Sequence, residues 1–216
     1  MTRSARVVPA ILTDSKSELS HMVSLANGFA PFVQVDLMDG VFVPSRSVEI
    51  DDLRNQGIEF KWEAHLMVAH PLLHLEALRN LGAARVIFHV ESGDEPALVV
   101  LHARSLGLGV GMAINPPTPV TSLEPYLRAV DSVLLMTVYP GYYGAPFVPE
   151  VMEKVGQVRA FRPDIEIGVD GGIKERNILA VVQQGVDTVC VGSAVFGQAD
   201  PAASYARLSG LVQGAA

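Results

Sequence analysis

The chain has 216 residues, of which 49% are hydrophobic and 18% charged, a composition typical of a globular protein and not of a disordered one. This length fits one domain with a substantial buried core. The formal net charge is −7, and lysine and arginine form no cluster that could follow a nucleic-acid backbone. We therefore expect no nucleic-acid partner, although local backbone N–H groups could still bind a small anion.

No stretch approaches the roughly 20 apolar residues that a membrane-spanning helix needs. The N-terminus lacks the apolar region and cleavage site of a secretory signal, so we expect a cytoplasmic protein with no membrane partner. Cys190 is the single cysteine, which excludes an internal disulfide and a cysteine-based zinc site. Because it lies in an apolar run, we expect a buried, unreactive thiol.

Eight short runs of apolar and β-branched residues recur at a mean spacing of about 26 residues, the length of one strand–helix unit. Each run predicts a strand, and in chain order they are 7–12, 32–37, 60–68, 85–90, 109–114, 132–138, 165–169 and 188–191. Amphipathic segments between them predict helices. Two examples are 72–81, which ends before Gly82, and the apolar pattern over 151–161, which opens at Pro149 and ends before Pro163.

Strands that are hydrophobic throughout, without alternation, indicate a parallel sheet covered on both faces. Eight of them alternating with helices predict a single (β/α)8 TIM barrel that spans residues 1–216 as one domain. No linker or low-complexity segment marks a second domain. The alternative is an open Rossmann-like sheet, but no Gly-x-Gly-x-x-Gly follows the first strand.

Polar residues end several of the apolar runs, and TIM barrels carry their functional groups at the C-terminal ends of the strands. Asp36, His65 and Asp170 are three such residues. Each alone could be a turn former, a helix cap or a hydrogen-bonded core residue. At one barrel mouth, two carboxylates and an imidazole can bind a divalent ion or shift one another's pKa for acid–base chemistry. Asp39 precedes Gly40 and is interpreted as a turn residue.

Glycine-containing turns follow the seventh and eighth predicted strands: Gly171-Gly172 and Gly192-Ser193. In TIM barrels this is the recurring phosphate position, where backbone N–H groups and a helix N-terminus meet the anion. Glycine lets the backbone approach closely, and a serine adds a hydroxyl donor. The two turns together predict a phosphate site.

The loop after the sixth predicted strand, residues 138–147, is rich in glycine and aromatic residues and longer than a typical βα turn. It contains Gly141 and Gly144. Two interpretations stay open: the loop closes over a ligand and excludes water, or it is a rigid surface turn.

Together these segments resemble ribulose-phosphate 3-epimerases over nearly the whole chain. The matching words, in order, are Val35-Asp-Leu-Met-Asp-Gly40 with Phe42-Val-Pro44, His65-Leu-Met67, His89-Val-Glu91, Asn115-Pro116 with Thr118-Pro119, Pro140-Gly141 with Gly144, Val169-Asp-Gly-Gly-Ile173 and Gly192-Ser193. The resemblance implies removal of a proton from C3 of a 2-ketose 5-phosphate, followed by reprotonation of the enediolate on its other face.

The resemblance assigns the two acid–base roles to Asp36 and Asp170. It implies a divalent metal (Zn, Fe, Mn or Mg) held by both aspartates, by His65 and by a second histidine, whose position is Gln34 here. The expected substrate-binding residues are His65, Met38, Met67, Met136, Gly141, Gly144, Gly171, Gly172, Gly192 and Ser193. A small phosphorylated sugar as ligand and a homo-oligomeric assembly are also implied.

The chain departs from the family pattern mainly at the site. Gln34 replaces a histidine ligand, and an amide oxygen is a weaker, harder donor than imidazole. Ala10 stands where the family has serine, Ser45 where it has asparagine, Tyr143 where it has glycine and Ala145 where it has glutamine. This clustering suggests a paralogue with an altered substrate or metal requirement.

Three functions remain open from the sequence. The first is an epimerase of ribulose 5-phosphate or of another ketose phosphate, such as a hexulose 6-phosphate. The second is a decarboxylase of the orotidine-phosphate type, but Asp36-Leu-Met-Asp39 lacks the lysine and the spacing of that motif. The third is a catalytically dead phosphosugar-binding barrel: both retained aspartates argue against it, whereas Gln34 and Ala10 argue for it.

Overall fold

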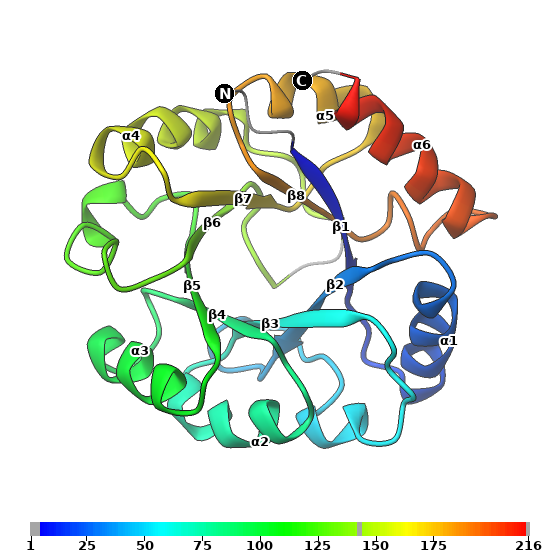
Figure 1. The fold of residues 1–216 in the computed structure, drawn as a ribbon, viewed down its shortest axis with the longest axis horizontal. Helices are drawn as coiled ribbons and strands as arrows, with labels where there is room; N and C mark the ends of the chain where they lie inside the picture. The colour runs from blue at the N-terminus through cyan, green and yellow to red at the C-terminus, as the bar shows by residue number, and fades with distance from the viewer. Residues whose placement is uncertain (1–4, 142–143, 215–216) are drawn as a thin grey trace.

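Eight parallel strands hydrogen-bond side by side in sequence order, and β8 returns to β1, so the sheet closes into a barrel surrounded by helices (Figure 1). The structure is a computed structural model that describes residues 5–141 and 144–214. The strands are β1 (Arg6–Ile11), β2 (Phe32–Met38), β3 (Lys61–Met67), β4 (Arg85–His89), β5 (Gly109–Ile114), β6 (Ser132–Met136), β7 (Glu166–Asp170) and β8 (Thr188–Val191). The predicted (β/α)8 TIM barrel is confirmed.

Six α-helices cover the outside of the barrel in the part of the chain that the structure describes: α1 (Lys16–Asn27), α2 (Leu75–Asn80), α3 (Pro96–Ser105), α4 (Glu153–Phe161), α5 (Glu175–Val182) and α6 (Pro201–Gln213). Four short 3-10 turns supplement them: η1 (Ile50–Leu53), η2 (Pro71–Leu73), η3 (Val120–Ser122) and η4 (Pro149–Met152). Among these residues, no helix is both long and apolar enough to cross a membrane.

The sequence predicted the strands to within two residues at either end, but it placed two helices less well. The segment 72–81 is divided between η2 and α2, and the helix predicted over 151–161 begins with η4 and becomes α-helical at Glu153. Pro71 and Pro149 begin these 3-10 turns. Tight turns of this kind are frequent at helix N-termini, and apolar spacing alone cannot separate them from an α-helix.

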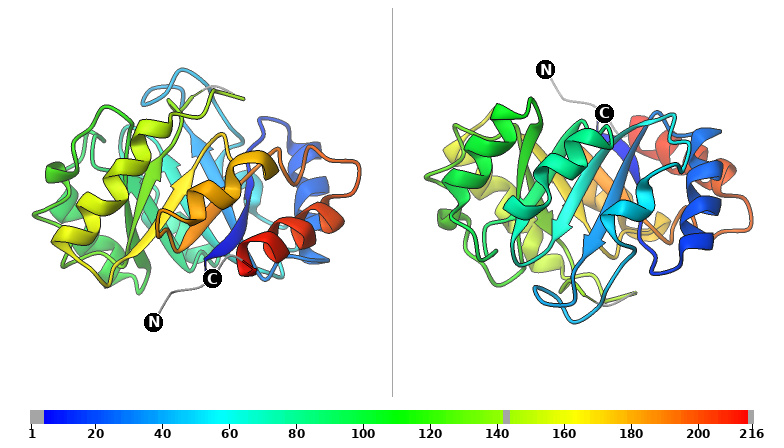
Figure 2. Two further views of the ribbon diagram at one scale, coloured as in Figure 1. Left: turned by 90° about the horizontal axis from the view of Figure 1, so that it is seen from above. Right: turned by 90° about the horizontal axis from the view of Figure 1, so that it is seen from below.

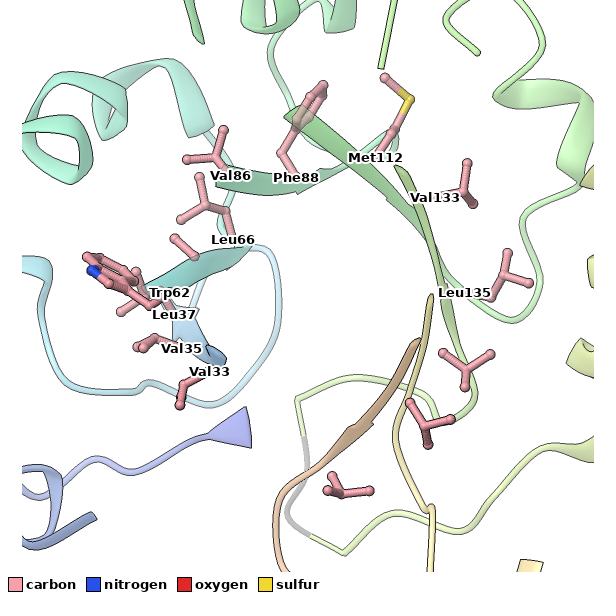
Figure 3. Close-up of a cluster of buried hydrophobic side chains, with 14 of the residues drawn as sticks. Val33, Val35, Leu37, Trp62, Leu66, Val86, Phe88, Met112, Val133 and Leu135 are labelled. Atoms are coloured by element: carbon pink, nitrogen blue, oxygen red, sulfur yellow. The ribbon is translucent and has the colours of Figure 1, made fainter. Parts of the chain in front are cut away.

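Side chains alternate along each strand between the barrel interior and the helices. Figure 3 shows Val33, Val35 and Leu37 of β2 pointing outward, as do Val133 and Leu135 of β6, into the large hydrophobic core. Because side chains of a strand alternate with period two, the residues between them point inward. On β2 these inward residues are Gln34 and Asp36. The outer core therefore determines which polar groups face the barrel axis.

Ion pairs occupy the N-terminal end of the barrel. The Arg85 guanidinium contacts the buried Glu63 carboxylate at 2.5 Å and Glu166 at 3.0 Å, and Arg6 also contacts Glu166 at 3.0 Å. These residues stand at or near the beginnings of their strands. At the opposite end, the long loops after β2 and β6 project side by side (Figure 2).

Candidate active site

A cavity of about 610 Å³ opens at the C-terminal mouth of the barrel. Its lining includes most of the residues predicted from the sequence: Asp36, Met38, Met67, Met136, Gly141, Gly144, Asp170, Gly171, Gly172, Gly192 and Ser193. His65 and Gln34 are fully buried and do not line the cavity, but both contact the aspartates from behind. The predicted set therefore comes together, with His65 and Gln34 in a layer below the ligand space.

The strand register brings the two aspartates to the cavity floor. Asp36 stands opposite His65 in the β2–β3 pairing, and Asp170 stands opposite Cys190 in the β7–β8 pairing. Thr137, directly after β6, holds the end of β7: its backbone N–H donates to the Asp170 carbonyl at 2.7 Å, and its hydroxyl lies 2.9 Å from the same oxygen. Asp170 is therefore fixed through its own backbone.

Gln34 connects the two carboxylates. Its amide nitrogen, Nε2, donates to Asp36 Oδ1 at 2.8 Å and to Asp170 Oδ2 at 2.7 Å. Its amide oxygen accepts a hydrogen bond from the Cys190 thiol, with Sγ and Oε1 3.1 Å apart. Both N–H donors of this amide and its oxygen therefore have hydrogen-bond partners inside the barrel.

Two histidines extend the network away from the cavity. His65 Nδ1 lies 2.9 Å from Asp36 Oδ1 and 3.4 Å from Asp170 Oδ2, while its Nε2 lies 3.0 Å from Nε2 of His89. Nδ1 of His89 lies 3.3 Å from Glu91 Oε2. An imidazolium at His65 can donate from both of its nitrogens, to Asp36 and to a neutral His89 that accepts.

The pKa values agree with these proton positions. Burial alone would lower the pKa of His65, but hydrogen bonds and charges from Asp170 and Asp36 raise it to about 9. Burial and the neighbouring His65 lower the pKa of His89 to about 4, against the effect of Glu91. A charged His65 and a neutral His89 follow at neutral pH.

The pKa of the Asp36 carboxyl group is raised towards neutral pH. Burial, followed by repulsion from the Asp170 carboxylate, raises the pKa of Asp36 to about 6, although His65 and Gln34 stabilise its charged form. A carboxyl group with a pKa raised towards neutrality can serve as a general acid or as a general base. This arrangement is suited to moving a proton at a carbon centre.

Three of the four expected metal ligands lie close enough together to bind one ion. Asp36, His65 and Asp170 each offer a ligand atom, and these atoms lie within 4.8 Å of one another, so the three residues could hold a divalent ion. Gln34 presents its amide nitrogen, which is not a metal ligand, to the same carboxylates. The Gln34 oxygen would join the set only after the amide rotates by half a turn.

Apolar side chains enclose the space above the carboxylates. Met38 and Met67 pack in a small cluster with Val43 and Phe42, and Met136 packs with Val138 in another cluster of the core. The three methionine side chains line the cavity. Thioether side chains are polarisable and flexible, so they give the cavity an apolar wall that can adapt to a ligand.

The glycine turns after β7 and β8 meet different constraints. Gly171 has a φ of +110°, and a Cβ there would lie 2.8 Å from Val138 Cγ1, so both conformation and space require glycine. Gly192 has room: a Cβ would meet only the Ala10 carbonyl, at an ordinary 3.5 Å. The need for glycine at 192 therefore does not come from the fold.

Lys174 was missed by the sequence analysis. It follows the Gly171-Gly172 turn and caps the N-terminus of α5, and its ammonium lies 2.5 Å from the Ser193 hydroxyl. The side chain thus places a positive charge between the two turns that were predicted to bind phosphate. A lysine following a Gly-Gly turn was the available signal.

Other residues that received no role from the sequence belong to the same network. His89 was noted as a polar residue at the end of an apolar run and, with Glu91, as part of a matching word, and the Cys190 thiol was expected to be inert. The thiol is buried, and burial raises its pKa well above the usual value, so it stays a protonated donor to Gln34. Asp39 is confirmed as a turn residue, because its carboxylate accepts from the N–H groups of Val41 and Phe42.

The loop after β6 is tied to the loop after β2. The Ser45 hydroxyl donates to the Gly141 carbonyl, and Gly141 has a φ of +99°. A Cβ at Gly141 would lie 2.7 Å from Pro44 Cδ, so the two loops pack closely at the cavity rim. Tyr143, one of the departures from the family pattern, lies outside the described residues.

A closed barrel of eight parallel strands with a cavity at its C-terminal mouth places the chain in the class of TIM-barrel proteins, which carry their functional groups at that mouth. The chain belongs to the ribulose-phosphate 3-epimerase family, whose model matches residues 6–196. It is thus a carbohydrate epimerase, an isomerase. The ribulose-phosphate 3-epimerase of Mycobacterium tuberculosis strain H37Rv is 36% identical over 211 residues, which cover 94% of this chain and 90% of that protein. The cytoplasmic isoform from Oryza sativa subsp. japonica is 34% identical and covers 97% and 95%.

Solved structures support the fold. A 3-hexulose-6-phosphate synthase from Salmonella typhimurium superposes with a TM-score of 0.74 at 15% identity, covering 98% of this chain and 100% of that one. An orotidine 5'-phosphate decarboxylase from Pyrococcus horikoshii superposes with a TM-score of 0.67 at 16% identity, covering 96% and 99%. At these identities the likeness shows a shared barrel and not a shared reaction.

Proposed function

We propose that this chain interconverts the C3 epimers of a phosphorylated ketose of the D-ribulose 5-phosphate and D-xylulose 5-phosphate type. The observation that carries the proposal is the pair Asp36 and Asp170 at one cavity floor, held by a shared hydrogen-bond donor. Inversion without a covalent intermediate is simplest with two acid–base groups on opposite faces of the reacting carbon.

In the proposed reaction, the ionised aspartate removes the C3 proton, and the electron pair forms an enediolate with the C2 carbonyl. The other aspartate, protonated, then delivers its proton to the opposite face of C3. The roles reverse for the opposite direction. The raised pKa of Asp36, about 6, supports one shared proton between the two groups. Met38, Met67 and Met136 would shield the enediolate from water.

The family resemblance implies a divalent ion, and Asp36, His65 and Asp170 are the residues that would hold it, where it would supply Lewis-acid stabilisation of the enediolate oxygens. The Gln34 amide already bridges the two aspartates, so no step of the proposed reaction depends on the ion. The hydrogen bonds from Gln34 and His65 hold the aspartates in place from the side opposite the cavity.

The phosphate of the substrate would lie at the turns Gly171-Gly172 and Gly192-Ser193, between backbone N–H groups and the Lys174 ammonium. Gly141 and Gly144 belong to the loop that would cover the sugar. The proposal includes a cytoplasmic enzyme, as the name of the rice relative states for that protein, and a homo-oligomer.

A second substrate class is a hexulose 6-phosphate. Ala10 and Ala145 line the cavity where the family pattern has serine and glutamine, and the smaller side chains leave room for a longer sugar. A catalytically dead binding protein is the third candidate, and the intact pair Asp36 and Asp170 argues against it.

The proposal is tested by incubating the purified protein with ribulose 5-phosphate, xylulose 5-phosphate and hexulose 6-phosphates and following epimer formation by NMR. Formation of the C3 epimer of at least one of them, abolished in the double variant Asp36→Asn/Asp170→Asn, is the expected result. Binding of these sugars without turnover would identify the dead barrel, and absence of both would overturn the proposal.

A further inference from the structure

Gln34 stands where the family pattern has a metal-binding histidine, but its amide makes hydrogen bonds to the two carboxylates that a metal ion would hold. Its nitrogen contacts Asp36 Oδ1 and Asp170 Oδ2, and His65 Nδ1 approaches the same two oxygens. A divalent ion held by Asp36, His65 and Asp170 would compete with the amide for these carboxylates. The amide thus occupies the bridging role between the two carboxylates.

The Cys190 thiol determines which end of the amide faces the carboxylates. The thiol is buried and protonated and donates to Gln34 Oε1 at 3.1 Å, which leaves Nε2 for the carboxylates. In the reverse orientation, Oε1 would lie at about the same short distances from two carboxyl oxygens, and the one proton that the pair shares could relieve only one of these contacts. The remaining repulsive contact in a buried site, together with the lost thiol hydrogen bond, is costly, so the chain's own residues favour the donor orientation.

An ion bound to the same two carboxylates would compete with both amide hydrogen bonds. Either the nitrogen would face the ion, without a lone pair to donate, or the amide would rotate and lose the thiol as donor. Hydrogen bonds from a neutral amide to charged carboxylates are among the stronger ones in proteins, so their loss weakens ion binding. Both routes oppose a tightly held ion.

We propose that Gln34 replaces the metal as the bridge between Asp36 and Asp170, so that this epimerase positions its acid–base pair without a bound ion. The inference rests on the proposed function for its catalytic meaning, whereas its metal-binding part stands independently. Gln34 is a positioning residue: it does not line the cavity and acts only through the two aspartates.

The decisive experiment measures Mn²⁺ affinity by calorimetry for the chelator-treated wild type, Gln34→His and Gln34→Leu, without substrate. If the amide competes with the ion, Gln34→Leu binds Mn²⁺ more tightly than the wild type, although it has gained no ligand. Gln34→His, which adds an imidazole ligand, should bind Mn²⁺ about 100-fold more tightly than the wild type. Changes in outer-shell partners alone alter metal affinity by about 10- to 100-fold. If Gln34 is instead a fourth ligand, Gln34→Leu binds more weakly than the wild type, and the inference is overturned.

Gln183→His serves as the matched control, because it makes the same exchange at an exposed position on the C-terminal end of α5. Its Mn²⁺ affinity should equal that of the wild type. If Gln34→Leu fails to fold, Gln34→Met keeps the length of the side chain without a hydrogen-bond donor, and a thioether is a poor ligand for Mn²⁺.

Metal analysis and turnover complete the test. The purified wild type should hold far less than one equivalent of metal, and its epimerisation rate should change by less than about twofold after chelation. A full equivalent of tightly held ion, or activity lost on chelation and restored by metal, would contradict the inference. If neither the chelated nor the Mn²⁺-loaded protein epimerises any ketose phosphate, the proposed function fails, while the order of the Mn²⁺ affinities still decides the role of Gln34.

Discussion

His65 and His89 face each other across the barrel interior with their Nε2 atoms 3.0 Å apart and their rings stacked at a centroid distance of 5.2 Å. Only one of two nitrogens at this distance can carry the shared hydrogen. The carboxylates on one side of the pair assign that hydrogen, and the positive charge, to His65.

This charge makes the stability of the fold depend on pH. The pKa of His65 rises from 6.5 to about 9 on folding, so the folded state binds more protons in this range than the unfolded state. The resulting stabilisation is fully present below pH 6.5 and is lost as the pH rises through 9. At roughly 1.4 kcal/mol per pKa unit, we expect a loss of up to about 3 kcal/mol.

Urea unfolding at pH 6.5 and pH 9.5 measures this difference. The control is His65→Gln, whose free energy of unfolding should change much less over the same interval. Equal pH dependence in the two proteins would show that His65 is not the titrating group. The raised pKa of Asp36 acts at lower pH, between about 4 and 6, and does not overlap with this window.

The two carboxylates should be required together for inversion. Asp36→Asn and Asp170→Asn keep the shape but remove a base, and a general acid–base group typically contributes about 10²–10⁴-fold. Each single variant should therefore lose epimerisation by at least that factor. Activity near the wild-type rate in either variant would rule out the two-base assignment.

Isotope exchange separates loss of proton transfer from loss of binding. In deuterated water, a variant that keeps one working base can still exchange the C3 proton with solvent while the configuration is retained. A variant that merely fails to bind loses exchange and inversion together. Mass spectrometry of the recovered sugar phosphate distinguishes the two outcomes.

The turn after β8 should accept a side chain but not a negative one. Gly192→Asp would bring a carboxylate to the phosphate position, so the affinity for a ketose phosphate should fall severely while the fold survives. Gly192→Ala is the matched control, because a Cβ at this position makes only ordinary contacts. Calorimetric binding and thermal unfolding measure the two effects, and unchanged affinity of Gly192→Asp would remove the phosphate site from this turn.

Lys174 should contribute to affinity through its charge. Lys174→Met keeps most of the length of the side chain but removes the ammonium that lies 2.5 Å from Ser193 Oγ. We expect KM to rise by about 5- to 30-fold with little change in kcat, because the proposed contact between the ammonium and the phosphate would be the same in the ground and transition states. Lys174→Arg should retain most of the affinity. A fall in kcat at constant KM would place Lys174 in the chemical step instead.

Much of the site was predictable because it depends on local patterns. The apolar runs indicated eight strands, and their spacing indicated a barrel. In a barrel the C-terminal strand ends meet at one mouth, so Asp36 and Asp170 could be paired although they are 134 positions apart. The glycine turns were recognisable for the same reason, because residues directly after a strand of a TIM barrel lie at this mouth.

The partners of those residues were decided only by tertiary structure. Gln34 was expected as a weak metal ligand, yet its amide donates to Asp170, 136 positions away, and accepts from Cys190, 156 positions away. Which end of an amide faces a carboxylate depends on the neighbour at its other end, and that neighbour is supplied by β8. The same holds for His65, whose protonation depends on His89 and both aspartates. The sequence by itself determined which strands carry Asp36, His65 and Asp170, whereas barrel closure determined which hydrogen bonds these side chains make, because hydrogen bonds between side chains require the distances that closure sets.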